Sequence, residues 1–310
     1  MEAPVLGAAA AARATMFRKD GTAQGVAKQR LIETIAEPSM RIIEDPYADL
    51  FVKGASIVKC LGHNFNNWAA SKIVPGLHQH LIARTKAIDE YVLEAAKGAT
   101  QYVVLGAGYD MRAYRLALPS SLKVFEVDQQ EVQELKKSRM PPELLATGNA
   151  TYVSVDFTTQ TLSEQLAQAG FQVGQPTIVT LEGVTQYIPK DACAATFRDM
   201  GELCGPGSAI FVSYVDELLR TSPAKCCGDG YPKPESTLQL VPYMAAKVGE
   251  PWISYYEKEE IKKVLASSGG FTLKSDTDMS DLNEAYFGKV GRLVPPEQLL
   301  LLERFAVATK

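Results

Sequence analysis

A buried strand that runs directly into a glycine turn constrains this chain more than any other feature. Residues 101–105 (QYVVL) are a short β-branched and apolar run, which is typical of a strand covered on both faces. Gly106 and Gly108 follow at once, on either side of Ala107. Because glycine has no Cβ atom, the backbone here can turn tightly and come close to a ligand. The pattern predicts a doubly wound α/β sheet with a nucleotide-type cofactor at this turn.

A second predicted strand, residues 123–128 (KVFEVD), ends in acidic residues. A carboxylate at this place accepts hydrogen bonds from the two hydroxyls of a ribose, so Asp128 is the candidate, with Gln129 beside it and Glu126 behind it. The dinucleotide fingerprint needs a third glycine where Met111 stands. This substitution disfavours NAD and favours an adenosine cofactor without a pyrophosphate.

Residues 103–116 (VVLGAGYDMRAYRL) followed by VFEVD resemble the leucine carboxyl methyltransferase family of S-adenosylmethionine-dependent enzymes. Three further segments match that family in the same order: residues 44–51 (EDPYADLF), 84–92 (RTKAIDEYV) and 181–189 (LEGVTQYIP). The resemblance covers almost the whole chain. It implies a class I methyltransferase fold, which is Rossmann-like: a mostly parallel seven-stranded sheet, a C-terminal antiparallel hairpin and a helical N-terminal lid.

The resemblance also implies a role for basic residues at the methionine end of the cofactor. Arg84 would bind the methionine carboxylate with its planar, paired donors. Among the basic residues of the lid, which include Arg30, Lys28 is the best-placed match for a second contact. The alternatives are an intrahelical ion pair for Arg84 and a solvated side chain for Lys28.

Two later strand ends complete the predicted crevice. Asp156 and Phe157 follow a predicted strand at residues 151–155, where the resemblance implies contacts with the adenine amino group and ring; an Asx turn or helix cap is the alternative for Asp156. Glu182 and Gly183 close the strand at residues 176–181. Ligands of open α/β sheets bind outside the carboxyl ends of the strands, so these residues should line one crevice with Gly106, Ala107, Gly108, Asp128 and Gln129. Tyr187, just beyond, either faces this crevice or is structural.

All three histidines, His63, His78 and His80, lie between residues 52 and 80. A His-x-His pair suggests a metal or a general base, but no carboxylate or cysteine cluster is near them in the sequence, so no metal is expected. His63 and His78 are kept as candidates for substrate contact or catalytic base.

The chain is expected to form one compact unit: a lid and substrate region at residues 1–80 and a methyltransferase domain at 81–310. An insertion at about 216–256, irregular over 221–241, should cover the active site. Residues 271–275 and 304–308 are predicted as the last two strands.

Composition narrows the function. A net charge of −4 gives no reason to expect nucleic acid or an anionic membrane as partner, and no apolar run is long enough for a membrane span. The five cysteines show neither disulfide nor zinc spacing, and no basic segment precedes the alanine-rich start, so a reducing cytoplasm is expected.

The leading hypothesis is an S-adenosylmethionine-dependent O-methyltransferase for a small, secondary-metabolite-like acceptor. A carboxylate acceptor needs no base, and the sequence offers no clear base, which favours an acidic acceptor. The alternative within the class is methylation of the C-terminal leucine carboxylate of a protein phosphatase. Outside the class remain a nicotinamide dehydrogenase, which the missing glycine disfavours, and a silent binding protein.

Overall fold

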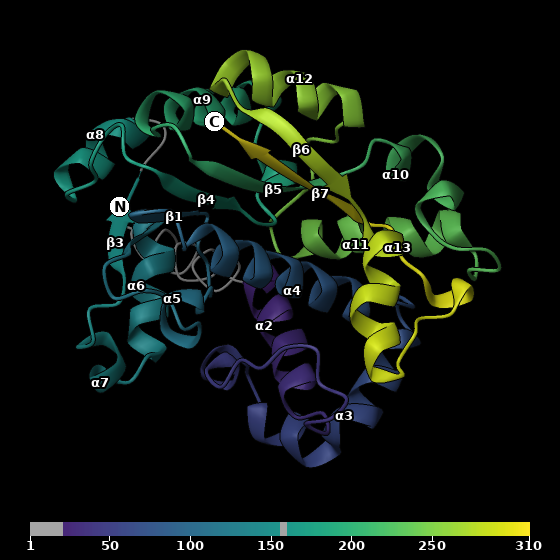
Figure 1. The fold of residues 1–310 in the computed structure, drawn as a ribbon. Coiled ribbons are helices and arrows are strands. Elements are labelled where there is room, and N and C mark those ends of the chain that lie inside the picture. The colour runs from purple at the N-terminus through teal and green to yellow at the C-terminus, as the bar shows by residue number, and fades with distance from the viewer. Residues whose placement is uncertain (1–20, 156–159) are drawn as a thin grey trace, which may run out of the picture.

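A computed structural model describes residues 21–155 and 160–310 (Figure 1). Its centre is a seven-stranded sheet in the order β3-β2-β1-β4-β5-β7-β6. β1 to β5 are parallel, and β7 pairs antiparallel with both β5 and β6. This confirms the predicted sheet with its antiparallel C-terminal pair. The strands are β1 (Gln101–Leu105), β2 (Lys123–Asp128), β3 (Thr151–Ser154), β4 (Thr177–Leu181), β5 (Ala209–Val215), β6 (Thr272–Thr277) and β7 (Glu303–Thr309).

The register of the central strands brings their carboxyl ends together. Leu105, the last residue of β1, pairs with Val127 of β2 on one side and Leu181 of β4 on the other. The segments that leave these three strands therefore begin side by side, at the edge where open α/β sheets bind ligands.

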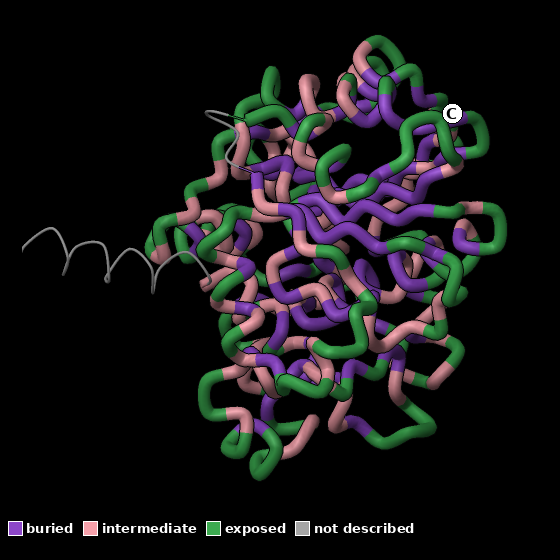
Figure 2. Tube along the Cα trace, turned by 90° about the vertical axis from the view of Figure 1, so that its left-hand side faces the viewer, coloured by how far each residue is buried: buried purple, intermediate pink, exposed green. Residues whose placement is uncertain are grey.

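Helices cover both faces of the sheet (Figure 1). The side of β1 that carries Val103 and Leu105 packs against α8, α9 and α12, and the side that carries Tyr102 and Val104 packs against α4. Figure 2 shows the resulting band of buried residues through the middle of the molecule. The helices around the sheet are α4 (Leu77–Ala95), α5 (Arg112–Arg115), α6 (Gln130–Arg139), α7 (Pro142–Leu145), α8 (Leu162–Gln168), α9 (Lys190–Leu203) and α12 (Lys258–Gly269).

The long helix α4 buries Ile82, Ile88 and Val92, as its apolar spacing predicts. It begins at Leu77 rather than near residue 81, directly after Gly76, which has a φ of 79°. The predicted division between residues 80 and 81 consequently falls inside this helix.

The N-terminal region is helical, as expected of a lid, and packs beside α4. It contains α2 (Gly21–Thr34), the short 3-10 helix η1 (Ala48–Phe51) and α3 (Ala55–Ser71). α3 is kinked at Gly62, where φ is 74° and ψ is 169°. In Figure 1, α2 and α3 lie below the sheet, beyond α4.

The segment predicted as an insertion lies between β5 and α12, and the expectation of an irregular chain over 221–241 is wrong in part. Helix α11 (Pro234–Lys247) occupies the second half of it. Proline in general disfavours a helix, but Pro234 stands at the first helical position, where its missing N–H group has no intrahelical partner to lose. The fully buried Leu238 anchors α11. The other short elements are α10 (Leu218–Thr221), α13 (Met279–Leu282), and the 3-10 or π turns η2 (Thr185–Tyr187), η3 (Pro223–Cys226), η4 (Asn283–Phe287), η5 (Gly288–Val290) and η6 (Pro296–Gln298).

Candidate active site

The turn after β1 can be made only with glycine. Gly106 has a φ of 67°, and a Cβ atom there would lie 2.3 Å from Cγ2 of Val184, which comes shortly after the end of β4 at Leu181. Gly108 has a φ of 45°. These left-handed conformations disfavour any side chain. The backbone at residues 106 and 108 therefore carries no side chain at the carboxyl edge of the sheet, while the side chain of Ala107 between them is buried.

Asp128 ends β2, as predicted, and its carboxylate binds this turn. Oδ2 accepts a hydrogen bond from the backbone N–H of Gly108 at 2.7 Å, and Oδ1 accepts one from Gln129 at 2.7 Å. Burial raises the pKa of Asp128 above its ordinary value, against the opposing effect of these two bonds. Each oxygen keeps a second lone pair, so the side chain retains the acceptors that a pair of hydroxyls requires.

Glu182, at the end of β4, lies between two buried arginines. Its Oε1 accepts from Nε of Arg84 at 3.0 Å, and its Oε2 accepts from Nη1 of Arg112 at 2.7 Å. Burial alone would raise the pKa of Glu182, but Arg112 and Arg84 outweigh it and lower that pKa to about 2. Glu182 is therefore ionised at neutral pH.

Arg84 is held from both sides. Its Nη1 donates to Oε2 of Glu303 at 2.6 Å, a carboxylate that is 1% exposed. Its Nη1 would also lie 3.5 Å from a Cβ atom on Gly183. No described residue accepts a hydrogen bond from its remaining terminal nitrogen, Nη2, so one donor of this cation is unused beside Glu182. The ion pairs run to other elements, not within α4.

Two arginines of this network were not predicted as site residues. Arg112 also donates to Asp89, from Nε at 2.7 Å, and to Asp110. Arg30 donates from Nη2 to the backbone oxygen of Tyr109 at 2.6 Å, and its charge helps to lower the pKa of Glu182. Arg112 lies inside the family motif, which was a usable signal. Glu303 offers no local signal, because it enters the site from the last strand.

The lid helix α2 covers the glycine turn with its first residues. A Cβ atom on Gly108 would lie 3.6 Å from that of Ala23. Thr22 binds Glu250 of the insertion through its hydroxyl and, at 3.2 Å, its backbone N–H, and it also interacts with Tyr187. Lys28 is exposed on this helix, whereas Arg30, two residues later, is buried and binds Asp45 at 2.7 Å. The lid thus presents Arg30 to the crevice and Lys28 to its outside.

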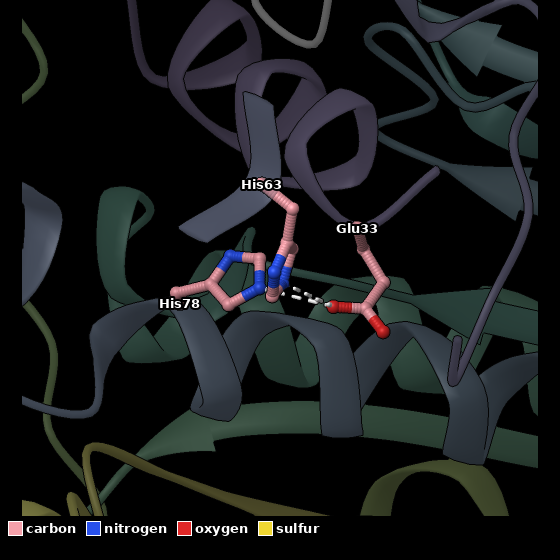
Figure 3. Close-up of side chains that lie close together, drawn as sticks. All are labelled: Glu33, His63 and His78. Atoms are coloured by element: carbon pink, nitrogen blue, oxygen red, sulfur yellow. Dashed lines mark hydrogen bonds and ion pairs between the residues drawn. The ribbon is translucent and has the colours of Figure 1, made fainter. Parts of the chain in front are cut away.

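The histidines lie apart from this edge, and the absence of a carboxylate near them, inferred from the sequence, is corrected by the fold. Glu33 of α2 contacts both His78 and His63 (Figure 3). Burial lowers the pKa of His78, which Glu33 opposes, while His63, His78 and Arg292 together lower that of Glu33 against its burial. His80 is the exception, since its Nε2 lies 3.3 Å from Glu303, the carboxylate that binds Arg84.

The predicted adenine contacts, Asp156 and Phe157, lie outside the described residues. Of the other positions predicted for the cofactor, all except Lys28 assemble at one edge: the glycine turn, Asp128 with Gln129, and Glu182 with Gly183 and Arg84. This edge offers backbone donors, ribose-type acceptors, one carboxylate for a cation and one unused guanidinium donor for an anion. An amino acid joined to a nucleoside matches that set.

The sequence profile named leucine carboxyl methyltransferase matches residues 23–201, which include every one of these positions. The chain belongs to the leucine carboxyl methyltransferase family. The predicted family is thereby confirmed. The match begins in helix α2, includes the rest of the N-terminal region and the first four strands, and ends in α9.

Two proteins similar to this chain are named as candidate S-adenosyl-L-methionine-dependent methyltransferases. YktD of Bacillus subtilis is 33% identical over 196 residues, which cover 63% of this chain and 61% of YktD. A protein of Mycolicibacterium smegmatis is 32% identical over 227 residues, covering 71% of this chain and 75% of the relative. The chain thus spans less than two thirds of the length of YktD.

A solved structure, that of a candidate methyltransferase from Thermobifida fusca, superimposes with a TM-score of 0.54 at 17% identity, covering 85% of this chain and 92% of that one. At this identity the likeness concerns the fold, and it confirms the predicted class I methyltransferase architecture. Within the described part of the chain, no helix is both long and apolar enough to cross a bilayer.

Proposed function

We propose that this family member binds S-adenosylmethionine at the carboxyl edge of its sheet and transfers the methyl group to a carboxylate or hydroxyl oxygen of a small, secondary-metabolite-like acceptor. The observation that carries the proposal is the convergence of the glycine turn, Asp128 and the Glu182–Arg84 pair on one edge. The names of both relatives support the same cofactor.

The residues of this edge fit the cofactor part by part. Asp128, with Gln129 beside it, accepts hydrogen bonds from the ribose hydroxyls, and Gly106 to Gly108 let the backbone approach the cofactor closely. Glu182 pairs with the methionine ammonium group, and Nη2 of Arg84 donates to its carboxylate. Asp156 and Phe157 are assigned to the adenine by the family resemblance. From the lid, the position of Arg30 suits the methionine end better than that of the exposed Lys28.

Bound S-adenosylmethionine supplies an electrophilic methyl group on a sulfonium. The protein then has to align the acceptor with this group and exclude water, and positioning provides most of the rate gain in such a displacement. Burial raises the pKa of Tyr187, so its phenol, which also interacts with Thr22 of the lid, stays protonated and would serve as a hydrogen-bond donor rather than as a base. This arrangement suits an acceptor that is already ionised, such as a carboxylate, because no base has to remove a proton.

The family description supports an alternative to the small-molecule acceptor, namely the C-terminal leucine carboxylate of a protein. Such an acceptor needs a docking surface for the protein that carries it, whereas a small molecule needs only the crevice. The net charge of −4 supports neither nucleic acid nor an anionic surface as a partner. A cytoplasmic location is part of the same proposal.

Transfer of label from S-adenosylmethionine with a radioactive methyl group tests the acceptor directly. The panel holds small carboxylic acids, phenols and a peptide that ends in leucine. We expect the labelled methyl group to appear on a small carboxylic acid. Base should then release the label as methanol, because base cleaves methyl esters and does not cleave aryl methyl ethers. Base-stable label would assign a hydroxyl. Label on the peptide alone would replace the small-molecule acceptor with a protein.

A further inference from the structure

Glu33, His63 and His78 converge from α2, α3 and α4 (Figure 3). Oε2 of Glu33 lies 3.1 Å from Nε2 of His78 and 3.7 Å from Nε2 of His63. The side chains of Glu33 and His78 are 0% and 1% exposed, and that of His63 is 14% exposed. Three potential ligand atoms thus meet below the surface, with His63 at the opening.

The outer nitrogens of both imidazoles are already engaged. Nδ1 of His78 lies 2.9 Å from the carbonyl oxygen Oε1 of Gln29, and Nδ1 of His63 lies 3.2 Å from the carbonyl oxygen Oδ1 of Asn64. A carbonyl oxygen only accepts, so each Nδ1 carries the hydrogen. Each neutral ring then turns the lone pair of Nε2 toward Glu33. Such outer partners orient the histidines of metal sites in the same way.

Three acceptors that face one another require a cation between them. Ligand distances of about 2.0–2.2 Å in a tetrahedral zinc site place the ligand atoms roughly 3.3–3.6 Å apart. The distances of 3.1 and 3.7 Å bracket that range. We propose that Glu33, His63 and His78 bind a divalent transition-metal ion such as Zn²⁺, with one position left for water. Two imidazoles and a carboxylate are a ligand set that suits such ions.

Arg292 supplies the positive charge when the metal is absent. Its Nη2 lies 3.1 Å from Oε2 of Glu33 and 3.2 Å from Nε2 of His63, so it occupies the space of the cation. Its Nη1 binds Oε1 of Glu33 at 2.7 Å and the backbone oxygen of Met40 at 2.8 Å. Met40 and Leu293, which flank this arginine at the rim, are 42% and 54% exposed. The guanidinium can therefore swing outward, and it competes with the metal for the same two atoms.

The site would fasten the lid and does not take part in methyl transfer. Glu33 lies ten residues beyond Ala23 on α2, a distance of about 15 Å along a helix. A metal here ties the far end of α2 to α3 and α4 while leaving the end at Gly108 unchanged. The inference is independent of the proposed methyltransferase activity.

Calorimetric titration of the chelator-treated protein with Zn²⁺ tests the site, and Co²⁺ absorption in the visible range reports on its geometry. We expect one ion per chain. His63→Gln, at the half-buried ligand, should weaken binding at least about 10–100-fold. Arg292→Met should tighten it by about tenfold or more, because a like charge no longer competes. Cys60→Ser, which removes an exposed thiol, is the control and should bind as the unaltered protein does.

The gain expected in Arg292→Met distinguishes the proposal from simple unfolding, since a damaged protein does not bind metal more tightly. Absence of stoichiometric metal from both the unaltered protein and Arg292→Met would overturn the site and leave a metal-free ion-pair network. Binding that survives His63→Gln and is lost in Cys60→Ser would also overturn it, by assigning the metal to a surface thiol.

Discussion

Two buried clusters of charge differ in what they leave unused. In the crevice, Glu182 is shared between Arg84 and Arg112, and Nη2 of Arg84 remains without a described partner. In the lid, Arg292 binds both Glu33 and Nε2 of His63, while Nε2 of His78 faces Glu33 as a further acceptor. Spare donors suit an anionic group such as the methionine carboxylate, and spare acceptors suit a metal ion. Burial of charge alone does not distinguish the two proposed ligands, whereas the hydrogen-bonding capacity that each cluster leaves unused does.

The largest expected effect comes from removing the central cation of the crevice. Arg112→Met leaves Asp89, Asp110 and Glu182 without their shared partner, and breaking a buried ion pair costs about 3–5 kcal/mol. Urea denaturation should show this loss. Arg292→Met should cost less, because the backbone N–H of Ile42 still donates a hydrogen bond to Glu33. An equal or larger loss in Arg292→Met would remove the distinction between the two clusters.

Acid should weaken the crevice next. Glu182 and Glu303 each have a pKa lowered from 4.5 to about 2, against burial, by Arg112 and Arg84 for the first and by Arg84 and His80 for the second. A lowered carboxylate pKa adds stability that is present above the unfolded value and is lost as the pH falls from 4.5 toward 2. Each contributes about 3 kcal/mol at most. The melting temperature of the unaltered protein should fall as the pH is lowered through this window, and it should fall less steeply in Glu303→Gln. An equally steep fall in both proteins would contradict the assignment.

Cofactor affinity should respond to Asp128. Asp128→Asn keeps the shape of the side chain but removes a charged acceptor, which is worth about 1.5–3 kcal/mol. S-adenosylhomocysteine should then bind roughly 10–100-fold more weakly. Glu94→Gln makes the same chemical change at an exposed site on α4 and should leave the affinity unaltered. Equal affinities in the two variants would remove Asp128 from the cofactor site.

The smallest effect is expected at Thr22, near the N-terminal end of the lid helix α2. Thr22→Val keeps the side-chain shape but loses the hydroxyl contact with Glu250, a partly buried hydrogen bond worth about 0.5–1.5 kcal/mol. Release of S-adenosylhomocysteine, followed by stopped-flow fluorescence, should be a few-fold faster than in Thr22→Ser. Identical release rates would mean that this contact does not hold the lid closed.

The elements that place the crevice were predictable because their signals are local. β1 and β2 begin and end where the sequence predicts, since an apolar β-branched run bounded by glycine or by an acidic residue specifies both the strand and its end. The turn at Gly106 follows from the same short stretch. Helix α11 is not predicted, because prolines disfavour a helix in general, whereas Pro234 occupies the first helical position, where proline is tolerated.

The partners of the buried charges were not predictable, because they are brought together by the fold. Arg84 meets Glu182 and Glu303 across 98 and 219 residues. His78 meets Glu33 across 45 residues, which is why a carboxylate seemed absent near the histidines. The sequence favours Lys28 over Arg30 as the lid contact, whereas the packing of α2 against Tyr109 buries Arg30 and leaves Lys28 exposed.

The most direct test of the cofactor site is a calorimetric titration with S-adenosylhomocysteine of the unaltered protein and of Arg84→Met, each repeated with NADH. The crevice as described predicts one S-adenosylhomocysteine per chain, at least about tenfold weaker in Arg84→Met, since a charge-assisted hydrogen bond to the carboxylate is lost. NADH should not bind. Equal affinity in Arg84→Met, or binding of NADH in place of S-adenosylhomocysteine, would contradict the assignment.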